Sequence, residues 1–497
     1  MARDFFLPTP HSVLISVVLI FGTSSILSAQ DQNPYAFVLN GSRIDGYDKI
    51  LQLDFSSPNI SALHTPQDVY VASLANFCHI VFTGDKKGYE QRKYAEKEYL
   101  SLLASMNESE ELVNFVTSEV RLHWAIIKIM QGEMLQGIWE LRQSIAIAKR
   151  NMSSYPEYIP QLKTMACLHL LLGSLPEKHQ WLIPIMGIKP NISLGLEMLQ
   201  TVREKTYFFR EEATIIESIS LSYLFNNSTE AFKSIQNLLD DESASLLTYY
   251  AAISICQKSG NAALSLRYID HILTTLKKTG TKPIPAIYYF KGEASLQLED
   301  YIKSIAAYSL FIKENLSEDL LKDAWFKISI ANLLHGNNSL AEFYFNKANV
   351  NGNTQTEADK NAHIILQKGI LPDSTLIKTR MLFDGGNYQK ALQVLKNAEV
   401  KNRDNDWLAE YHYRIGRIYQ KLNKVSLAKE NLIKSTEITA SKELYFAANA
   451  CLELGLMAKQ AADKSNAQYW LKKSMEYKGH PYTQSIASKA SRALNEL

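Results

Sequence analysis

Apolar residues recur at helical spacing along most of the chain, in pairs of segments joined by short polar turns. The clearest pair lies within residues 407–437, where Gly416 stands in the first segment. In the second segment, Ala428, Leu432 and Ser435 follow at spacings of four and three, which places them on one face of a helix. Twelve residues separate Gly416 from Ala428. This arrangement predicts two antiparallel helices that pack together where their side chains are smallest.

The same pattern returns along the chain. Gly292, for example, precedes Ser304 by twelve residues. Successive pairs begin about 34 to 40 residues apart, a period typical of helical repeat proteins. We therefore expect faint pairs over residues 66–150 and clear ones over 210–478. A final helix near 482–497 is expected to cap the stack, which would otherwise end on an apolar face.

Residues 156–205 interrupt this rhythm. Five prolines fall in the first part of the segment, and prolines end helices: Pro156, Pro160, Pro176, Pro184 and Pro190. We expect helices over 161–172 and 193–202. The apolar residues between them predict a compact apolar hairpin. We expect it to be buried against its neighbours, because large apolar patches are rare on soluble proteins. The alternative is a surface that docks on a membrane or a partner.

The first residues have the pattern of an export signal. Arg3 lies in a short polar start, residues 13–21 are apolar except for Ser16, and a small-residue site ends at Ala29. The apolar stretch is shorter than the roughly 20 residues that a membrane-spanning helix needs. We expect cleavage after Ala29; an uncleaved anchor or a buried helix is the alternative. No Cys follows the apolar core, which disfavours a lipid anchor.

The expected organisation follows from these patterns. It comprises a signal peptide (1–29), a lead-in segment (30–65), divergent helical repeats with the apolar hairpin (66–205), and a regular repeat array with a capping helix (206–497). We expect the mature protein to be exported to the periplasm or the envelope, without a stable membrane span after cleavage.

Composition agrees with a helical, folded chain. Hydrophobic residues make up 46% and charged residues 21% of the 497 positions, and glycine and proline are sparse at 21 and 14. The net charge of +2 gives no overall attraction to nucleic acid, so we expect no nucleic-acid partner. The four cysteines lie far apart in apolar helical contexts, which indicates buried thiols: Cys78, Cys167, Cys256 and Cys451. One long-range disulfide is the alternative.

The repeats over 210–478, and more faintly over 66–150, resemble the tetratricopeptide repeat superfamily. The resemblance implies an all-α, right-handed α-solenoid of helix hairpins. Such a fold serves many partners, so it is a poor guide to function.

Residues 161–200 carry a more particular resemblance. The motifs Leu172-Gly-Ser-Leu-Pro176, Met186-Gly-Ile188 and Gly195-Leu-Glu-Met-Leu199 resemble the tetratricopeptide-repeat protein 39 and inclusion-body-clearance family. They look closer still to exported helical-repeat proteins of Bacteroidetes-type bacteria. Pro190-Asn-Ile192 stands where the eukaryotic family has Gly-Asp-Arg. That family is not known for an enzyme activity, so the resemblance implies an interaction scaffold.

A search for catalytic and cofactor motifs is negative. The chain contains no phosphate-binding Gly-x-x-x-x-Gly-Lys, no Gly-x-Gly-x-x-Gly, no Gly-x-Ser-x-Gly and no His-Glu-x-x-His. No two of the eleven histidines are spaced to hold zinc from one helix. We therefore expect no cofactor, no metal and no enzyme activity.

A concave groove is the remaining candidate for binding. Its lining is expected to include the fifth position of the first helix of each repeat, which lies three residues before the packing glycine or its substitute: Tyr250, Tyr289, Phe326, Tyr413 and Leu452. Basic Arg414, Arg417 and Lys421 lie beside Tyr413. Aromatic and basic side chains together could hold an extended peptide or its carboxylate. The alternative is that the tyrosines only pack the repeats.

Two functions stay open on this basis. The first is a non-enzymatic scaffold outside the cytoplasm that binds a protein or peptide in the groove. The second is a carbohydrate-binding helical-repeat protein of an outer-membrane uptake system, in which aromatic rings stack on sugars. An enzyme is the least favoured class, and the oligomeric state is left open.

Overall fold

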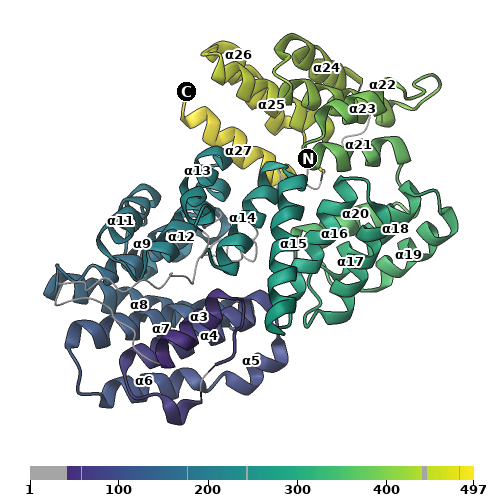
Figure 1. The fold of residues 1–497 in the computed structure, drawn as a ribbon. Helices are drawn as coiled ribbons and strands as arrows, with labels where there is room; N and C mark the ends of the chain where they lie inside the picture. The colour runs from purple at the N-terminus through teal and green to yellow at the C-terminus, as the bar shows by residue number, and fades with distance from the viewer. Residues whose placement is uncertain (1–41, 58, 176, 242–243, 439–444, 481) are drawn as a thin grey trace.

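The computed structural model describes residues 42–497 apart from 58, 176, 242–243, 439–444 and 481. Every regular element in this part of the chain is a helix, and successive helices pair as antiparallel hairpins that stack side by side (Figure 1). This is the all-α, right-handed α-solenoid of tetratricopeptide-like hairpins that the sequence predicts. The predicted signal peptide lies outside the described residues.

The first half of the chain forms the lower left part of the view in Figure 1. Its elements are α3 (Ser42–Leu51), the 3₁₀ helix η1 (Ile60–Ala62), α4 (Pro66–Thr83), α5 (Lys86–Arg92), α6 (Ala95–Ser105), α7 (Glu110–Met130), α8 (Met134–Ser154), α9 (Pro160–Gly173), η2 (Glu177–Leu182), α10 (Ile183–Met186), α11 (Ile192–Lys205), α12 (Arg210–Tyr223) and α13 (Ser228–Leu239). The predicted apolar hairpin corresponds to η2 and α10. Its Leu182 and Met186 are buried, whereas Trp181 is 62% and Ile185 45% exposed. The expected burial is therefore only partial.

The second half contains the more regular repeats. Its helices are α14 (Leu246–Ser259), α15 (Ala262–Thr279), α16 (Pro285–Gln297), α17 (Tyr301–Glu314), α18 (Leu321–Leu334), α19 (Asn338–Val350), α20 (Glu357–Leu366), α21 (Ser374–Asp384), α22 (Tyr388–Lys396), α23 (Asn405–Lys421), α24 (Val425–Ile438), α25 (Phe446–Gln460), α26 (Lys464–Glu476) and α27 (Thr483–Asn495). Helix α27 is the final helix that the sequence predicts near 482–497. Helix α20 falls outside the predicted pattern: it stands alone between two hairpins and lengthens the interval between them.

The hairpin turns share one backbone geometry. In most of them a residue with positive φ follows the first helix and an Asn or Asp comes next, although Glu133 stands there in the α7–α8 turn and Lys424 in the α23–α24 turn. Gly260 (φ 78°) precedes Asn261, whose side chain accepts a hydrogen bond from the backbone N–H of Leu264 at 3.2 Å. Glu299 (φ 65°) precedes Asp300, which caps α17 in the same way. Asn and Asp are preferred N-caps, so this short polar signal starts each second helix at a defined residue.

Close packing of the paired helices depends on glycine. A Cβ atom added at Gly416 would lie 2.7 Å from Cγ of Leu432, and one at Gly455 would lie 2.7 Å from Cγ of Leu471. The Ser435 hydroxyl, on the same face as Leu432, donates to the Ala409 carbonyl at 2.8 Å. The prediction that the helices meet where their side chains are smallest is confirmed.

One hydrophobic core runs through the first half and into the middle of the chain, from Tyr47 to Ala294. It takes in α3, so the end of the lead-in segment packs into the same core as the repeats. All four cysteines are buried, and none of them forms a disulfide bond among the described residues. The prediction of buried thiols is therefore confirmed.

A charged cluster lies inside this core. The ammonium group of Lys163 on α9 contacts Glu119 on α7 at 2.5 Å and Glu212 on α12 at 2.8 Å. It also donates to the Tyr70 hydroxyl on α4 at 3.0 Å. Burial lowers the pKa of Lys163, but Glu119 and Glu212 outweigh it and the pKa is raised. One cation thus joins four helices.

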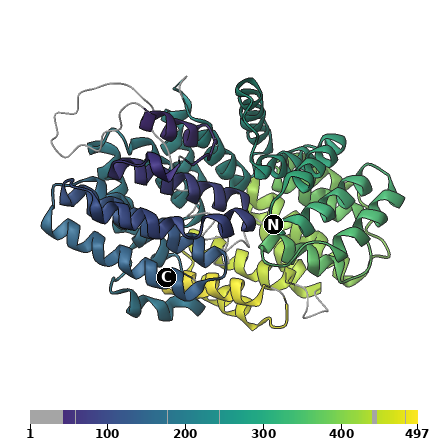
Figure 2. The same ribbon diagram turned by 90° about the horizontal axis from the view of Figure 1, so that it is seen from below.

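The superhelix brings distant turns into contact. The N–H of Ala262, at the start of α15, donates to the carbonyl of Gly385 at the end of α21 at 3.3 Å. A Cβ added at Gly386 would overlap the carbonyl oxygen of Gly260, so the two turns meet backbone to backbone. The stack therefore curves back on itself, and Figure 2 shows the C-terminal helices between the N-terminal half and the central repeats.

A second buried carboxyl group makes the stability depend on pH. Asp323 on α18 accepts a hydrogen bond from the Tyr289 hydroxyl at 2.6 Å, and burial outweighs the opposing effect of Lys327, so the pKa of Asp323 is raised to about 6. When an acidic group has a higher pKa in the folded state than in the unfolded state, the protein loses stability as the pH rises from the unfolded-state pKa to the folded-state pKa. Relative to Asp323→Asn, we expect the wild type to lose up to about 3 kcal/mol between about pH 4 and pH 6.

Urea unfolding of both proteins across this range measures that difference. Asp300→Asn is a control for which the stability difference should change with pH in the opposite direction. Asp300 caps a helix at the surface, and the Lys303 side chain lowers the pKa of its carboxyl group. The advantage of Asp300 over Asn should therefore be lost as the pH falls. A stability difference between wild type and Asp323→Asn that stays constant from pH 4 to pH 6 would contradict the prediction.

Candidate functional site

The structure buries most of the residues that the sequence suggested for a groove. Tyr250, Tyr289, Phe326, Tyr413, Arg414 and Arg417 are each at most 8% exposed, and Lys421 is the exposed member of the set. Leu452, at the corresponding position of α25, is also buried. The expectation of an open aromatic stripe is therefore wrong at these positions. Helices pack so closely around these positions that their side chains lie between helices.

The contacts of the buried aromatic residues explain their position. The ring of Tyr250 packs against Phe82 and Phe290, with centroids 5.2 and 5.7 Å apart. The ring of Phe326 lies 6.4 Å from that of Phe345. The Tyr250 contacts join separate hairpins and the Phe326 contact lies within one hairpin, so both side chains pack the repeats, which is the alternative that the sequence left open.

The basic residues of α23 have two different environments. Arg414 pairs with Glu410 one turn earlier, its Nε lying 2.7 Å from the carboxylate. Arg417 reaches the next hairpin, where it pairs with Glu453 on α25. Lys421 lies one turn beyond Arg417 and makes no ion pair with any described residue. Arg417 and Lys421 therefore remain candidates for binding, because both line a cleft.

We call this cavity of about 550 Å³ the basic cleft. It lies where the α12–α13 turn and the end of α14 face α23, α25 and α27. Its lining is Tyr223, Leu224, Phe225, Asn226, Lys258, Arg417, Gln420, Lys421, Leu452, Glu453, Leu456, Lys459, Lys489, Arg492, Ala493 and Glu496. Segments from the middle and the end of the chain thus form one site.

Positive charge dominates the basic cleft. Six lining residues are basic and two are acidic. Glu453 is held by Arg417 and by the Gln420 amide, which donates at 2.9 Å. Glu496 contacts Lys459 at 2.5 Å. Basic side chains therefore outnumber acidic ones by four within the lining, which gives this cleft a local excess of positive charge.

An apolar wall stands beside these charges. Phe225, in the α12–α13 turn, is 41% exposed, and the partly buried Leu224 and Leu456 lie on either side of the cleft. A ligand with both negative charge and an apolar group would match this lining.

Sequence reasoning missed the contributions of the α12–α13 turn, Lys258 and α27. These segments lie far from α23 in the sequence, and only the course of the superhelix brings them together. The local sequence did indicate part of the site, through the three basic residues on α23. Two of them, Arg417 and Lys421, line the cleft.

Two further structural findings bear on function. Among the described residues, no group of three or more His, Cys, Asp or Glu side chains is placed to hold a metal ion. In the same part of the chain, no helix has the combined length and apolar character that crossing a bilayer requires.

No family model matches the chain, and no curated protein matches it. Solved helical-repeat structures are similar to it at low identity. A monomeric mutant of IFIT1 with Gppp-AAAA shares 10% identity over 97% of this chain and 100% of that chain, with a TM-score of 0.35. The human IFIT1 dimer with m7Gppp-AAAA shares 12% over 93% and 96%, also at 0.35. The APC/C hetero-tetramer Cut9–Hcn1 shares 12% over 90% and 95%, at 0.27. At these TM-scores no ligand or assembly carries over to this chain.

Proposed function

We propose that this protein is a non-enzymatic interaction scaffold whose basic cleft binds an acidic segment of a partner protein. The observation that carries the proposal is the excess of basic over acidic side chains around a cavity with an apolar wall. Complementary charge speeds the encounter of two partners and selects among them. The apolar wall adds contact area for a side chain that lies between the carboxylates.

A protein segment fits this site better than a nucleic acid does. The whole chain carries a net charge of only +2 and a pI near 8.1, whereas nucleic-acid-binding domains are usually more basic. The cleft volume of about 550 Å³ suits a few side chains rather than a folded domain.

We also infer that the scaffold works outside the cytoplasm, as an exported bacterial tetratricopeptide-repeat protein. The pattern of residues 1–29 supports export, and the motifs within 161–200 support that relationship. N-terminal sequencing of the protein recovered from its own cell is expected to begin at Gln30. A chain that still begins at its first residues would contradict cleavage.

Peptide binding tests the cleft directly. We expect a short labelled peptide of Glu, Asp and Leu residues to bind, and the same peptide with Gln and Asn at every acidic position not to bind. The double variant Lys421→Glu/Lys489→Glu should bind the acidic peptide at least about ten-fold more weakly, because it reverses two charges in the lining. Fluorescence anisotropy at low and high salt measures both effects.

A matched control is Lys401→Glu/Lys472→Glu, which changes the net charge equally at two exposed positions outside the cleft. It should bind like the wild type. Equal affinity of the cleft variant and the wild type would overturn the proposal. The proposal would also be overturned if the protein did not bind the acidic peptide but did bind a single-stranded oligonucleotide.

A further inference from the structure

A second hollow lies where three hairpin turns meet, and we call it the turn hollow. It has a volume of about 510 Å³. The start of α13, the α14–α15 and α21–α22 turns and the end of α16 supply its lining, which is Ser228, Thr229, Phe232, Ser259, Gly260, Asn261, Ala263, Leu298, Gly385, Gly386, Asn387 and Tyr388. Residues close to each other in the chain line the two cavities: Asn226 and Lys258 line the basic cleft, and Ser228 and Ser259 line the turn hollow.

The chemistry of the turn hollow differs from that of the basic cleft. Every residue that lines it is uncharged. A charged ligand would lose hydration there without gaining an opposite charge, so the lining favours a neutral ligand. Ser, Thr and Asn side chains provide hydrogen-bonding groups on its surface.

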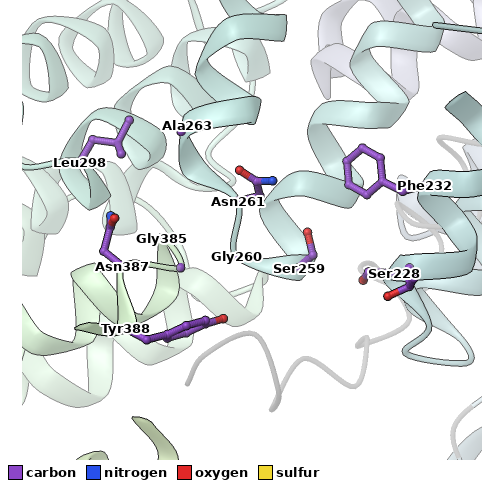
Figure 3. A pocket seen from close by; sticks show the side chains of 12 residues that line it. Ser228, Phe232, Ser259, Gly260, Asn261, Ala263, Leu298, Gly385, Asn387 and Tyr388 are labelled. Carbon is purple, nitrogen blue, oxygen red and sulfur yellow. The ribbon is translucent and has the colours of Figure 1, made fainter. Parts of the chain in front are cut away.

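Two aromatic rings flank these polar groups. Figure 3 shows Phe232 and Tyr388 on different sides of the hollow, with Ser259 and Asn261 between them. Both aromatic side chains are half-buried. The Tyr388 ring packs edge to face against Phe383, at a centroid distance of 5.3 Å and an interplanar angle of 62°. A supported ring gives a ligand a rigid surface to lie on.

The polar groups retain capacity for a ligand. The side-chain oxygen of Asn261 caps α15 by accepting from the Leu264 N–H at 3.2 Å, and Figure 3 shows its amide nitrogen turned towards Phe232. The amide nitrogen of Asn387 donates to the Gln297 carbonyl at 3.4 Å, which leaves its oxygen as an acceptor. The hollow therefore presents a donor from one turn and an acceptor from another.

The backbone of the turns is held in place. Gly386 approaches the Gly260 carbonyl too closely for a side chain, and the Ala262 N–H donates to the Gly385 carbonyl at 3.3 Å. Preorganised walls reduce the entropy that binding costs.

We propose that the turn hollow binds an uncharged carbohydrate. A sugar ring has an apolar face of C–H groups and a rim of hydroxyls that both donate and accept. The apolar face matches Tyr388 or Phe232, and the rim matches Asn261, Asn387 and the serine hydroxyls. Other ligands match less well: an anion finds no cation here, and a fully apolar ligand would leave the amides without partners.

Saturation-transfer NMR and calorimetry with a panel of neutral mono- and oligosaccharides test this site. We expect at least one neutral sugar to bind the full chain. Tyr388→Ala and Phe232→Ala should each weaken that binding at least about ten-fold, through loss of a stacking surface. The control Tyr469→Ala removes an aromatic ring that is 55% exposed elsewhere, and it should leave sugar binding unchanged.

Asn261→Asp keeps the test informative if an aromatic variant fails to fold. Asp preserves the oxygen that caps α15 but removes the amide donor and adds a charge, so sugar binding should be lost while the melting temperature changes little. The proposal is overturned if no neutral sugar binds, or if binding survives both Tyr388→Ala and Asn261→Asp. It is also overturned if inorganic phosphate displaces the sugar. Unchanged acidic-peptide affinity in Tyr388→Ala would show that this site is separate from the basic cleft.

Discussion

Lys163→Met is expected to destabilise the protein by about 3–5 kcal/mol, more than any other single substitution proposed for this chain. The variant removes the cation that two buried carboxylates, Glu119 and Glu212, share, and it leaves both of them in the core. Methionine fills a similar volume, so the loss reflects charge rather than a cavity. Urea unfolding at pH 7 measures it.

The surroundings of Lys163 explain why the effect should be large. Its ammonium group lies 5.1 Å from the centre of the Tyr70 ring and 5.0 Å from that of Phe209. The Thr164 hydroxyl donates to Glu119 at 2.6 Å. Neither carboxylate can reach water, because both side chains are fully buried.

Acidification should reduce the deficit of this variant. Burial raises the pKa of Glu212, and Lys163 is the largest influence that lowers it. Without the lysine, the folded-state pKa rises further above the unfolded value, so the variant loses stability as the pH increases through that interval. The difference from wild type should therefore be smaller at pH 5 than at pH 7.

Lys233→Met provides the surface control. Lys233 is 79% exposed and lies 3.5 Å from Glu230, so its loss should change stability by at most about 0.5 kcal/mol. Adding Glu119→Gln and Glu212→Gln to Lys163→Met should restore part of the lost stability, because neutral amides need no cation. A Lys163→Met protein as stable as the wild type at pH 7 would show that the cluster does not support the core.

Gly386→Ala is expected to cost about 2–4 kcal/mol, the second large effect. Gly386 has φ 87°, which strains any residue with a side chain. The new methyl group would also overlap the backbone carbonyl of Gly260, which cannot rotate away as a side chain could. Alanine should therefore separate the two turns and loosen the superhelix.

Gly336→Ala is the matched control. Gly336 has φ 90° in the corresponding turn between α18 and α19, and nothing lies within 4 Å of a Cβ added there. It should cost only the backbone strain, about 1 kcal/mol. Denaturation compares the two variants, and small-angle scattering should show expansion in Gly386→Ala alone. Equal stability losses without expansion would mean that the contact between the turns does not hold the superhelix.

The hairpins themselves could be predicted from short stretches of sequence. The helix that carries Gly416 packs closely against the helix that carries Ala428, as the pattern predicts, and the residue that meets Gly416 there is Leu432. The polar turns work in the same local way: a residue such as Gly260 takes a positive φ, and Asn261 caps the next helix. The existence of the final helix and the burial of the cysteines were predicted for the same reason.

The exposure of the groove residues could not be predicted in this way. Tyr413 lies on the expected face of α23, but how far that face is covered depends on how closely the next hairpin packs. That packing places Phe446 of α25 against Tyr413, with ring centroids 5.6 Å apart. Small differences in packing angle between neighbouring hairpins accumulate along a solenoid, and no single repeat specifies the total curvature that results.

Sequence alone therefore determined the repeating unit: the helix pairs, their turns, their small-residue contacts and the all-α fold. These features depend on residues within about one repeat length of each other. Only the tertiary structure decided what the repeats build together. It enclosed Lys163 with two carboxylates, joined Gly386 to Gly260, and brought Lys421 to the turn that carries Phe225. Both proposed sites lie between segments far apart in the chain, because the curvature of the stack, rather than any local motif, sets which turns meet.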